Sequence, residues 1–150
     1  VDQYEARIAE IRSRLDAADI HPVVADVGYW DGQVTTSCYG VPCLVFADLG
    51  LEMAPLMNAT EDGLPASDEY AELSPEQLGQ LEGIDVVFTG AEEDGTVWVE
   101  EDEALQQNAI WQNLSFVQSG EYYPYNYEMI YGSPSGMDAF LTVVEKALLG

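Results

Sequence analysis

An apolar run from Ile84 to Thr89, interrupted only by Asp85, constrains the fold of this chain more than any other feature. A continuous apolar strand is typical of a sheet that is covered on both faces. Helical and strand patterns alternate on either side of this run, which favours helices as the covering layers. We therefore expect an α/β fold, a single three-layer lobe whose central mixed or mostly parallel sheet is flanked by helices.

Three helices have clear sequence signals. Apolar residues recur every three or four positions between residues 4 and 18 and again between residues 137 and 148, which predicts an amphipathic helix near each end. Ser74, Pro75 and Gln77 supply an N-cap, a first-turn proline and a capping-box partner, so a third helix should begin there.

The remaining segments have weaker patterns. Residues 22–27 and 33–38 predict two strands around a turn that contains Gly32. Residues 41–51, with proline near the start and glycine near the end, predict a helix, and residues 52–69 predict a long loop. Short helices near 102–107 and 108–114 and a strand near 121–125 should follow.

The charge of the chain excludes several partners. The 150 residues include 28 acidic side chains and four basic ones, for a formal net charge of −24. Nucleic acids and anionic membranes need a basic face, so neither is expected to bind. Arg7, Arg12 and Arg14 fall together on the first predicted helix, where we expect a solvated helix face. The sequence contains no run of 18 apolar residues, the length that a membrane-spanning helix needs.

Cys38 and Cys43 are the only cysteines, and their state is open. In an exported protein they could form a disulfide that closes a small loop. A reduced, buried pair fits the sequence equally well, because neither a metal-ligand pattern nor a Cys-x-x-Cys spacing is present.

The chain lacks the residue patterns of an enzyme. His21 is the only histidine and precedes Pro22 at a strand entrance, where a structural or exposed role is expected. The segment 132–136 resembles a nucleophile elbow, but Pro134 stands where serine is required. The acidic runs 92–94 and 100–103 lack the spacing of an EF-hand loop, so we expect no metal site and no catalytic residues.

Aromatic side chains near loops are abundant instead. Tyr29 and Trp30 follow a strand and precede Gly32, and Tyr39 stands before the next helix. Such rings bury large areas at small entropic cost and suit a cleft for a bulky, partly apolar ligand. These three residues are therefore predicted ligand contacts, whereas Trp111 is expected to be structural.

The order of motifs from residue 70 to 149 resembles a known family. A Ser-x-Glu-Gln-Leu helix start (74–78), a hydrophobic strand (84–88), a tryptophan-containing short helix (108–114), the segment 117–123 and a final amphipathic helix follow one another. This order is similar to the carboxy-terminal lobe of the binding proteins that deliver ferric siderophores, haem or vitamin B12 to ABC importers. The likeness matches segment 117–123 to a strand of that family.

The resemblance also implies domain limits and further site residues. Residues 1–19 would be the end of the interlobe helix and residues 20–150 the carboxy-terminal lobe of a two-lobed protein, whose first lobe, signal and lipid anchor would lie upstream. Glu76 matches the glutamate that docks on arginines of the permease. Tyr70 matches an aromatic position beside the ligand, and Tyr127 and Tyr131 lie in the loop that closes this side of the cleft.

These observations together predict a solute-binding component of an ABC importer that captures a ferric siderophore and passes it to a membrane permease. We expect an extracytoplasmic monomer without enzymatic activity or a cofactor. No candidate loop contains arginine or lysine, so a neutral or cationic chelate is favoured. The alternatives are a haem or cobalamin carrier of the same family, a flavodoxin-like or hydrolase-like enzyme fragment, and an acidic interaction domain.

Overall fold

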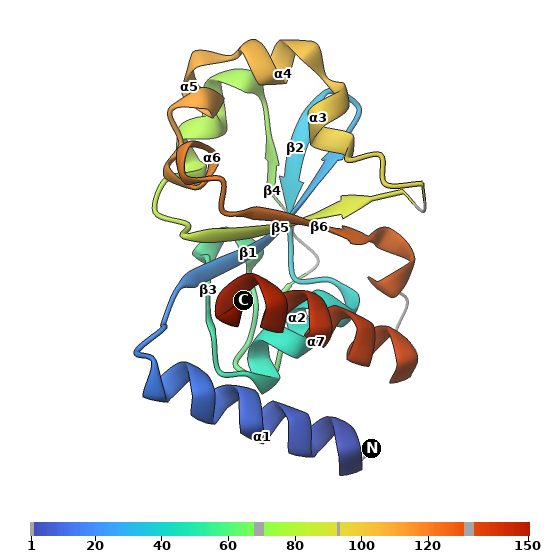
Figure 1. Ribbon diagram of the computed structural model, residues 1–150. Helices are drawn as coiled ribbons and strands as arrows, with labels where there is room; N and C mark the ends of the chain where they lie inside the picture. Colours follow the sequence, from blue (N-terminus) through green and yellow to red (C-terminus); the bar gives the residue numbers. More distant parts are fainter. Residues whose placement is uncertain (1, 68–70, 93, 131–133) are drawn as a thin grey trace.

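A mixed sheet of six strands lies between helical layers (Figure 1). The computed structural model describes residues 2–67, 71–92, 94–130 and 134–150. The strands are β1 (Val23–Trp30), β2 (Gln33–Thr36), β3 (Glu52–Met53), β4 (Ala71–Leu73), β5 (Val86–Ala91) and β6 (Tyr122–Asn126). The helices are α1 (Asp2–Ala17), α2 (Gly40–Asp48), α3 (Trp98–Glu101), α4 (Glu103–Gln107), α5 (Ala109–Gln112), α6 (Ser115–Ser119) and α7 (Pro134–Leu149), and the 3-10 helices are η1 (Pro55–Met57), η2 (Pro75–Leu81) and η3 (Tyr127–Ile130).

The strand order β4-β2-β1-β5-β6 confirms the expected α/β architecture with a mixed sheet. Strands β1, β5 and β6 are parallel, and β2 runs antiparallel to both β1 and β4. Strand β3 pairs in parallel with the first residues of β1. All six residues of β5 are buried, which confirms that the apolar run is covered on both faces.

The main core lies between the sheet and helices α2 and α7. Phe46 of α2, Phe88 of β5 and Phe140 of α7 meet with ring centroids 5.5 to 5.7 Å apart, and Tyr125 of β6 stacks edge-on against Phe140. Figure 1 shows α2 and α7 below the sheet, α1 below them, and α3 to α6 above it. The two long amphipathic helices predicted at the ends of the chain are thus confirmed.

Arg12 and Arg14 of α1 are exposed, as expected of a solvated helix face, and Arg7 is half-buried, but all three also bond to other helices. Arg7 pairs with Asp138 at 2.9 Å, and Arg14 pairs with Glu145 at 2.8 Å, so both hold α1 against α7. Arg12 donates a hydrogen bond to the Asp48 carbonyl at the end of α2. The packing of two apolar helix faces brings the acidic side of α7 beside α1, a contact that helical spacing within α1 could not reveal.

Several local expectations are corrected. Tyr29 and Trp30 belong to β1, because the hairpin turns within Asp31 and Gly32, both at positive φ, and Trp30 still pairs with Gln33. Residues 115–119 form α6, which ends at Gly120 in the left-handed conformation, so only the last part of segment 117–123 is strand. The expected loop from residue 52 contains β3 and η1.

Candidate functional site

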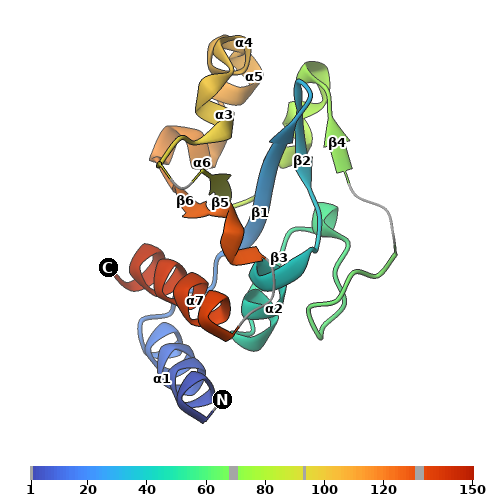
Figure 2. The same cartoon turned by 90° about the vertical axis from the view of Figure 1, so that its right-hand side faces the viewer.

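A hollow of about 290 Å³, here called the inner hollow, lies beside the later residues of β1 and β5 and the last part of β6. Strands β5 and β6 run towards the right of Figure 1 and towards the viewer in Figure 2, between α3 above and α2 below, and β1 runs upwards beside them in Figure 2. In parallel sheets ligands bind beyond the carboxyl ends of the strands. The lining residues are Asp26, Gly28, Thr35, Thr36, Ser37, Tyr39, Gly90, Trp98, Tyr125 and Tyr127.

Two strand glycines shape the floor of the inner hollow. A Cβ on Gly90 would lie 3.1 Å from Cζ3 of Trp98, so the indole rests almost directly on the backbone of β5. A Cβ on Gly28 would lie 2.9 Å from Oγ1 of Thr35 on the neighbouring strand. Glycine inside a strand marks such close approaches. Here the missing side chain of Gly90 lets the Trp98 ring pack directly on the backbone of β5.

Asp26 places a carboxyl group at this floor. The Tyr125 hydroxyl donates a hydrogen bond to Oδ1 of Asp26 over 2.6 Å. Desolvation raises the pKa of Asp26 to about 7, although the hydrogen bond from Tyr125 opposes the shift. The pKa of Tyr125 is also raised, by burial and by the neighbouring carboxylate. Near neutral pH this carboxyl group can therefore exist in either protonation state.

A second, more apolar hollow of about 420 Å³, here called the outer hollow, shares Trp98 with the first. Its lining residues are Tyr29, Trp30, Asp31, Glu92, Trp98 and Glu101. The centroid of the Trp98 ring lies 5.1 Å from that of Tyr127, which lines the inner hollow, so Trp98 borders both spaces. Trp30 is 76% exposed, which leaves its ring available for contact.

A hydrogen bond connects the end of β1 to the start of α4. The Tyr29 hydroxyl donates to the Asp102 carboxylate, which also caps α4 by accepting from the Leu105 amide. The bond to Asp102 raises the pKa of Tyr29 to about 12, and the same bond lowers the pKa of Asp102. Tyr29 is therefore a neutral donor at physiological pH and positions one wall of the outer hollow.

The charged side chains that line the two hollows are all acidic. Asp26 lines the inner hollow, while Asp31, Glu92 and Glu101 line the outer one. A concave surface with one sign of charge concentrates ions of the opposite sign. Neither lining contains arginine or lysine, so a polyanionic ligand is unfavourable at this surface.

The structure brings four of the six predicted ligand contacts to this surface. Tyr39 and Tyr127 line the inner hollow, and Tyr29 and Trp30 line the outer one. The other two, Tyr70 and Tyr131, lie outside the described residues.

Sequence reasoning missed the centre of the site. Trp98, Asp26 and Tyr125 were not predicted as contacts, although each lines the inner hollow. Two signals were available: an isolated acid in the apolar strand 23–27, and glycines at strand positions 28 and 90. Trp98 had no such signal, because it reaches the hollow only through the packing of α3 on β5.

A disulfide holds the rim of the inner hollow. Cys38 and Cys43 are bonded, with their Cα atoms 5.2 Å apart, which decides between the two states left open by the sequence. Both cysteines are buried, whereas Tyr39, directly between Cys38 and α2, is 58% exposed. The short closed loop thus restrains a protruding aromatic residue at the mouth of the hollow.

Glu76 lies apart from the hollows, in the first turn of η2, and its side chain is exposed. The Ser74 amide donates to Oε1 of Gln77 over 3.1 Å, which confirms the predicted helix start. The predicted helix is a 3-10 helix. An outward-pointing acid at this place is available to a partner.

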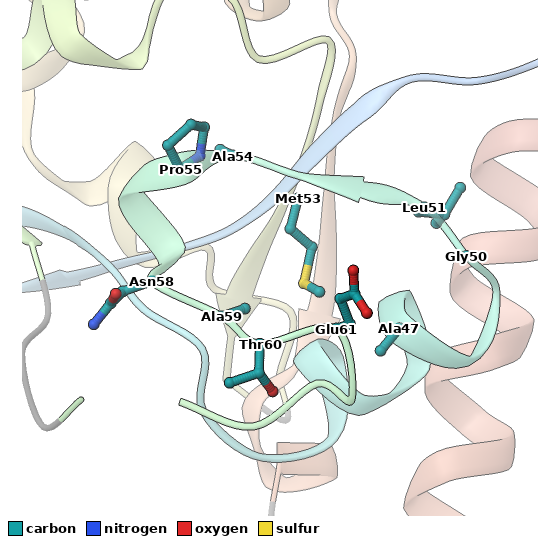
Figure 3. A pocket seen from close by; sticks show the side chains of 10 residues that line it. All are labelled: Ala47, Gly50, Leu51, Met53, Ala54, Pro55, Asn58, Ala59, Thr60 and Glu61. Atoms are coloured by element: carbon teal, nitrogen blue, oxygen red, sulfur yellow. The ribbon is translucent and has the colours of Figure 1, made fainter. Parts of the chain in front are cut away.

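Another hollow, of about 470 Å³, lies beside the beginning of β1, between β3, the end of α2 and the segment 58–61. In Figure 3 Met53 points from β3 towards the segment that carries Glu61, while Asn58 turns away. Most of its other lining residues are small, among them Ala47, Ala54 and Ala59, and none is aromatic. This hollow lacks the ring walls of the other two.

The described residues contain no group of three or more histidine, cysteine, aspartate or glutamate side chains that could hold a metal ion. His21 is exposed, and its Nε2 lies 3.3 Å from Oδ1 of Asp19. Trp111 is 2% exposed and packs edge-on against Phe116, as expected of a structural residue. Among the helices described, none is both long and apolar enough to cross a membrane.

Solved structures of siderophore-binding proteins share this fold. The chain matches the siderophore periplasmic binding protein from the fuscachelin gene cluster of Thermobifida fusca with a TM-score of 0.80 and 22% identity, over 99% of this chain and 52% of that one. A FhuD-fold binding protein component of a ferrichrome ABC transporter from Bacillus subtilis matches with a TM-score of 0.71 and 19% identity, over 98% of this chain and 54% of that one. Vibrio cholerae FhuD bound to Fe3+-Desferal matches with a TM-score of 0.67 and 20% identity, over 99% of this chain and 53% of that one.

No family model matches the sequence, and no curated protein matches it either. The chain spans about half the length of the solved structures that it resembles. At this level of identity the likeness concerns architecture, and it confirms the fold implied by the sequence resemblance. The chain has the fold of one half of the siderophore-binding proteins of ABC importers.

Proposed function

We propose that this protein is the solute-binding component of an ABC importer for a ferric siderophore. The observation that carries the proposal is the pair of aromatic-walled hollows at the strand ends, in a fold shared with proteins described as siderophore-binding. Rings of Trp30, Trp98 and Tyr127 offer large apolar contact areas to the organic shell of an iron chelate, and their polar atoms can orient it.

The chain would supply one wall of the binding cleft. Each structural neighbour is about twice as long as the part that the chain matches, which supports the reading of residues 1–19 as the end of an interlobe helix and residues 20–150 as a carboxy-terminal lobe. The first residues of α1 lie on the same side of the molecule as the strand ends (Figures 1 and 2). A lobe joined there would face the hollows.

The acidic side chains that line the hollows favour some classes of siderophore over others, according to the charge of the ferric complex. Three hydroxamates cancel the charge of ferric iron, whereas three catecholates leave the complex strongly anionic. Asp26, Asp31 and Glu101 would repel the latter and tolerate or attract a neutral or cationic complex. We infer that the ligand is a ferric hydroxamate. The rings of Tyr29 and Tyr39, and those of Tyr70 and Tyr131, would contribute to its capture.

Location and partners follow from the same proposal. A disulfide between Cys38 and Cys43 suits an oxidising, extracytoplasmic compartment. The exposed Glu76 is available to pair with an arginine of a membrane permease by a charge-assisted hydrogen bond. We propose a monomeric binding protein, held at the membrane by a lipid anchor, that hands its ligand to that permease.

A fluorescence titration tests the proposal. Ferric desferrioxamine B and ferrichrome are added to the protein while tryptophan emission is followed, with free tryptophan as the control for light absorbed by the complexes. We expect saturable quenching with a dissociation constant weaker than about 1 μM, because only one wall of the cleft is present. Trp98→Phe should reduce the quenching, and Trp111→Phe, whose ring is buried against Phe116, should not.

The result can contradict the proposal in two ways. Absence of saturable binding to every ferric hydroxamate would refute the function. Submicromolar affinity for a ferric catecholate would refute both the argument from charge and the argument that a second wall is needed.

A further inference from the structure

The inner hollow combines several aromatic rings with a single charged group. Tyr39, Trp98, Tyr125 and Tyr127 supply the rings, and Asp26 is its one charged lining residue. Aromatic faces and a carboxylate are the groups that recognise an organic ammonium ion, through cation–π attraction and a charge-assisted hydrogen bond. The remaining lining residues are glycine, serine and threonine, which add no competing charge.

Asp26 has no cationic partner within the part of the chain that the structure describes. The one side-chain donor to its carboxylate there is the neutral Tyr125 hydroxyl, which bonds to Oδ1, while the Thr36 hydroxyl donates to the Asp26 carbonyl. The described ion pairs of Arg7 and Arg14 connect α1 to α7. In Figure 1 helix α1 lies below α2 and α7, and the sheet lies above them. Asp26 is half-buried, and a carboxylate partly withdrawn from water without a counter-ion is costly, so a ligand cation would reduce that cost.

The size of the inner hollow limits what can enter it. At about 290 Å³ it lies at the lower end of the range for drug-sized ligands, so it suits one arm of a chelate better than a whole one. The larger outer hollow, on the other side of Trp98, is available to the body of the complex. A ligand with a charged arm would use both.

We propose that the inner hollow binds the protonated amine of a cationic ferric hydroxamate, with Asp26 as the counter-ion and the rings of Trp98 and Tyr127 as walls. This inference rests on the proposed function and narrows its substrate class. The Tyr125 hydroxyl holds Asp26 in place through Oδ1 and leaves the carboxylate able to accept a further donor.

The test compares two ligands that differ at this amine, which is a charged ammonium in one and an uncharged acetamide in the other. Ferric desferrioxamine B, which carries a free amine, and the same complex after N-acetylation are equilibrated with the 150-residue protein by dialysis, and bound ligand is read from the visible absorbance of the iron centre. We expect the cationic complex to bind at least about tenfold more tightly, which corresponds to about 1.4 kcal/mol. This comparison needs no variant, so it does not depend on how a substitution affects folding.

Three variants then assign the effect to a residue. In Asp26→Asn the ratio of the two affinities should fall to about one. In Asp16→Asn, which removes an exposed charge on α1, the tenfold preference should remain. Asp31→Asn, which removes an acid from the lining of the outer hollow, should reduce the preference less than Asp26→Asn does. Circular dichroism checks that each variant is folded.

Each other outcome overturns the inference. Equal affinity for both complexes would refute it while leaving the proposed function intact, because the hydroxamate would still be bound. A preference that survives Asp26→Asn and disappears in Asp31→Asn would place the amine in the outer hollow instead. If neither complex binds, the proposed function fails and this inference fails with it.

Discussion

Replacing Asp26 by asparagine should stabilise the protein increasingly as the pH rises. The carboxyl is desolvated, and its pKa is raised from an ordinary value of 3.8 to about 7 in the folded state. Between these two values the folded state binds a proton that the unfolded chain has released, so stability falls with rising pH. Asparagine keeps an acceptor for Tyr125 but carries no charge, so the variant escapes this loss.

The pKa shift sets the size of the effect. Each pH unit between the two pKa values costs about 1.4 kcal/mol, so the whole shift corresponds to a ceiling of about 4 kcal/mol. Between pH 5 and pH 8 the difference in unfolding free energy between variant and wild type should change by roughly 2 to 3 kcal/mol, because the loss levels off above the folded-state pKa. This is a large part of the stability of a small domain.

Urea denaturation of both proteins at several pH values from 5 to 8 measures this difference. Taking the difference between variant and wild type removes the background from the other acidic groups. Asp16→Asn, at an exposed position of α1, is the matched control and should show little dependence on pH over this range. If the effect of Asp26→Asn is equally independent of pH, the carboxyl is hydrated in the folded protein and the account of the inner hollow given above is wrong.

Three further predictions concern the surface, the disulfide and the docking residue. Because the net charge is −24, raising sodium chloride from 0.1 M to 1 M should screen self-repulsion and increase the melting temperature by at least about 4 °C, and an unchanged value would contradict this. Replacing Cys38 and Cys43 together by serine should cost about 2 kcal/mol in urea denaturation, since the closed loop is short, and a shift of tens of degrees in melting temperature would contradict it. In the two-lobed binding protein that we propose, Glu76→Gln should reduce siderophore uptake while ligand affinity and melting temperature stay unchanged, because a lost dipole interaction is worth less than about 1 kcal/mol. Glu72→Gln, exposed on β4, is its control, and tenfold weaker ligand binding in Glu76→Gln would refute a docking role.

Local patterns predicted the elements that depend on burial along one segment. The run ending at Thr89 became a fully buried strand, and the spacing around Phe140 became a long helix on the sheet. The capping residues Ser74 and Gln77 marked a helix start correctly. In each case the cause of the structure lies within a few residues of chain, which is why sequence alone was sufficient.

Contacts between distant segments were not predictable in this way. Arg14 and Glu145 pair across more than a hundred residues, and Tyr125 reaches Asp26 from the far end of the chain. No periodicity within one segment encodes either distance. The disulfide belongs to the same class, because two cysteines in a short loop are compatible with both redox states until the backbone places their Cα atoms 5.2 Å apart.

The sequence by itself determined the α/β class, the acidic and lysine-poor surface, and the concentration of aromatic residues near turns, because composition and periodicity carry these properties. Tertiary structure decided which aromatic residues form a site. Trp98 lines both hollows only because Gly90, on a strand that precedes it, lets its ring rest on the sheet. The pKa of Asp26 is raised only because the packed sheet and helices withdraw its carboxyl group from much of the surrounding water, and desolvation is a property of the packed molecule that no single segment possesses.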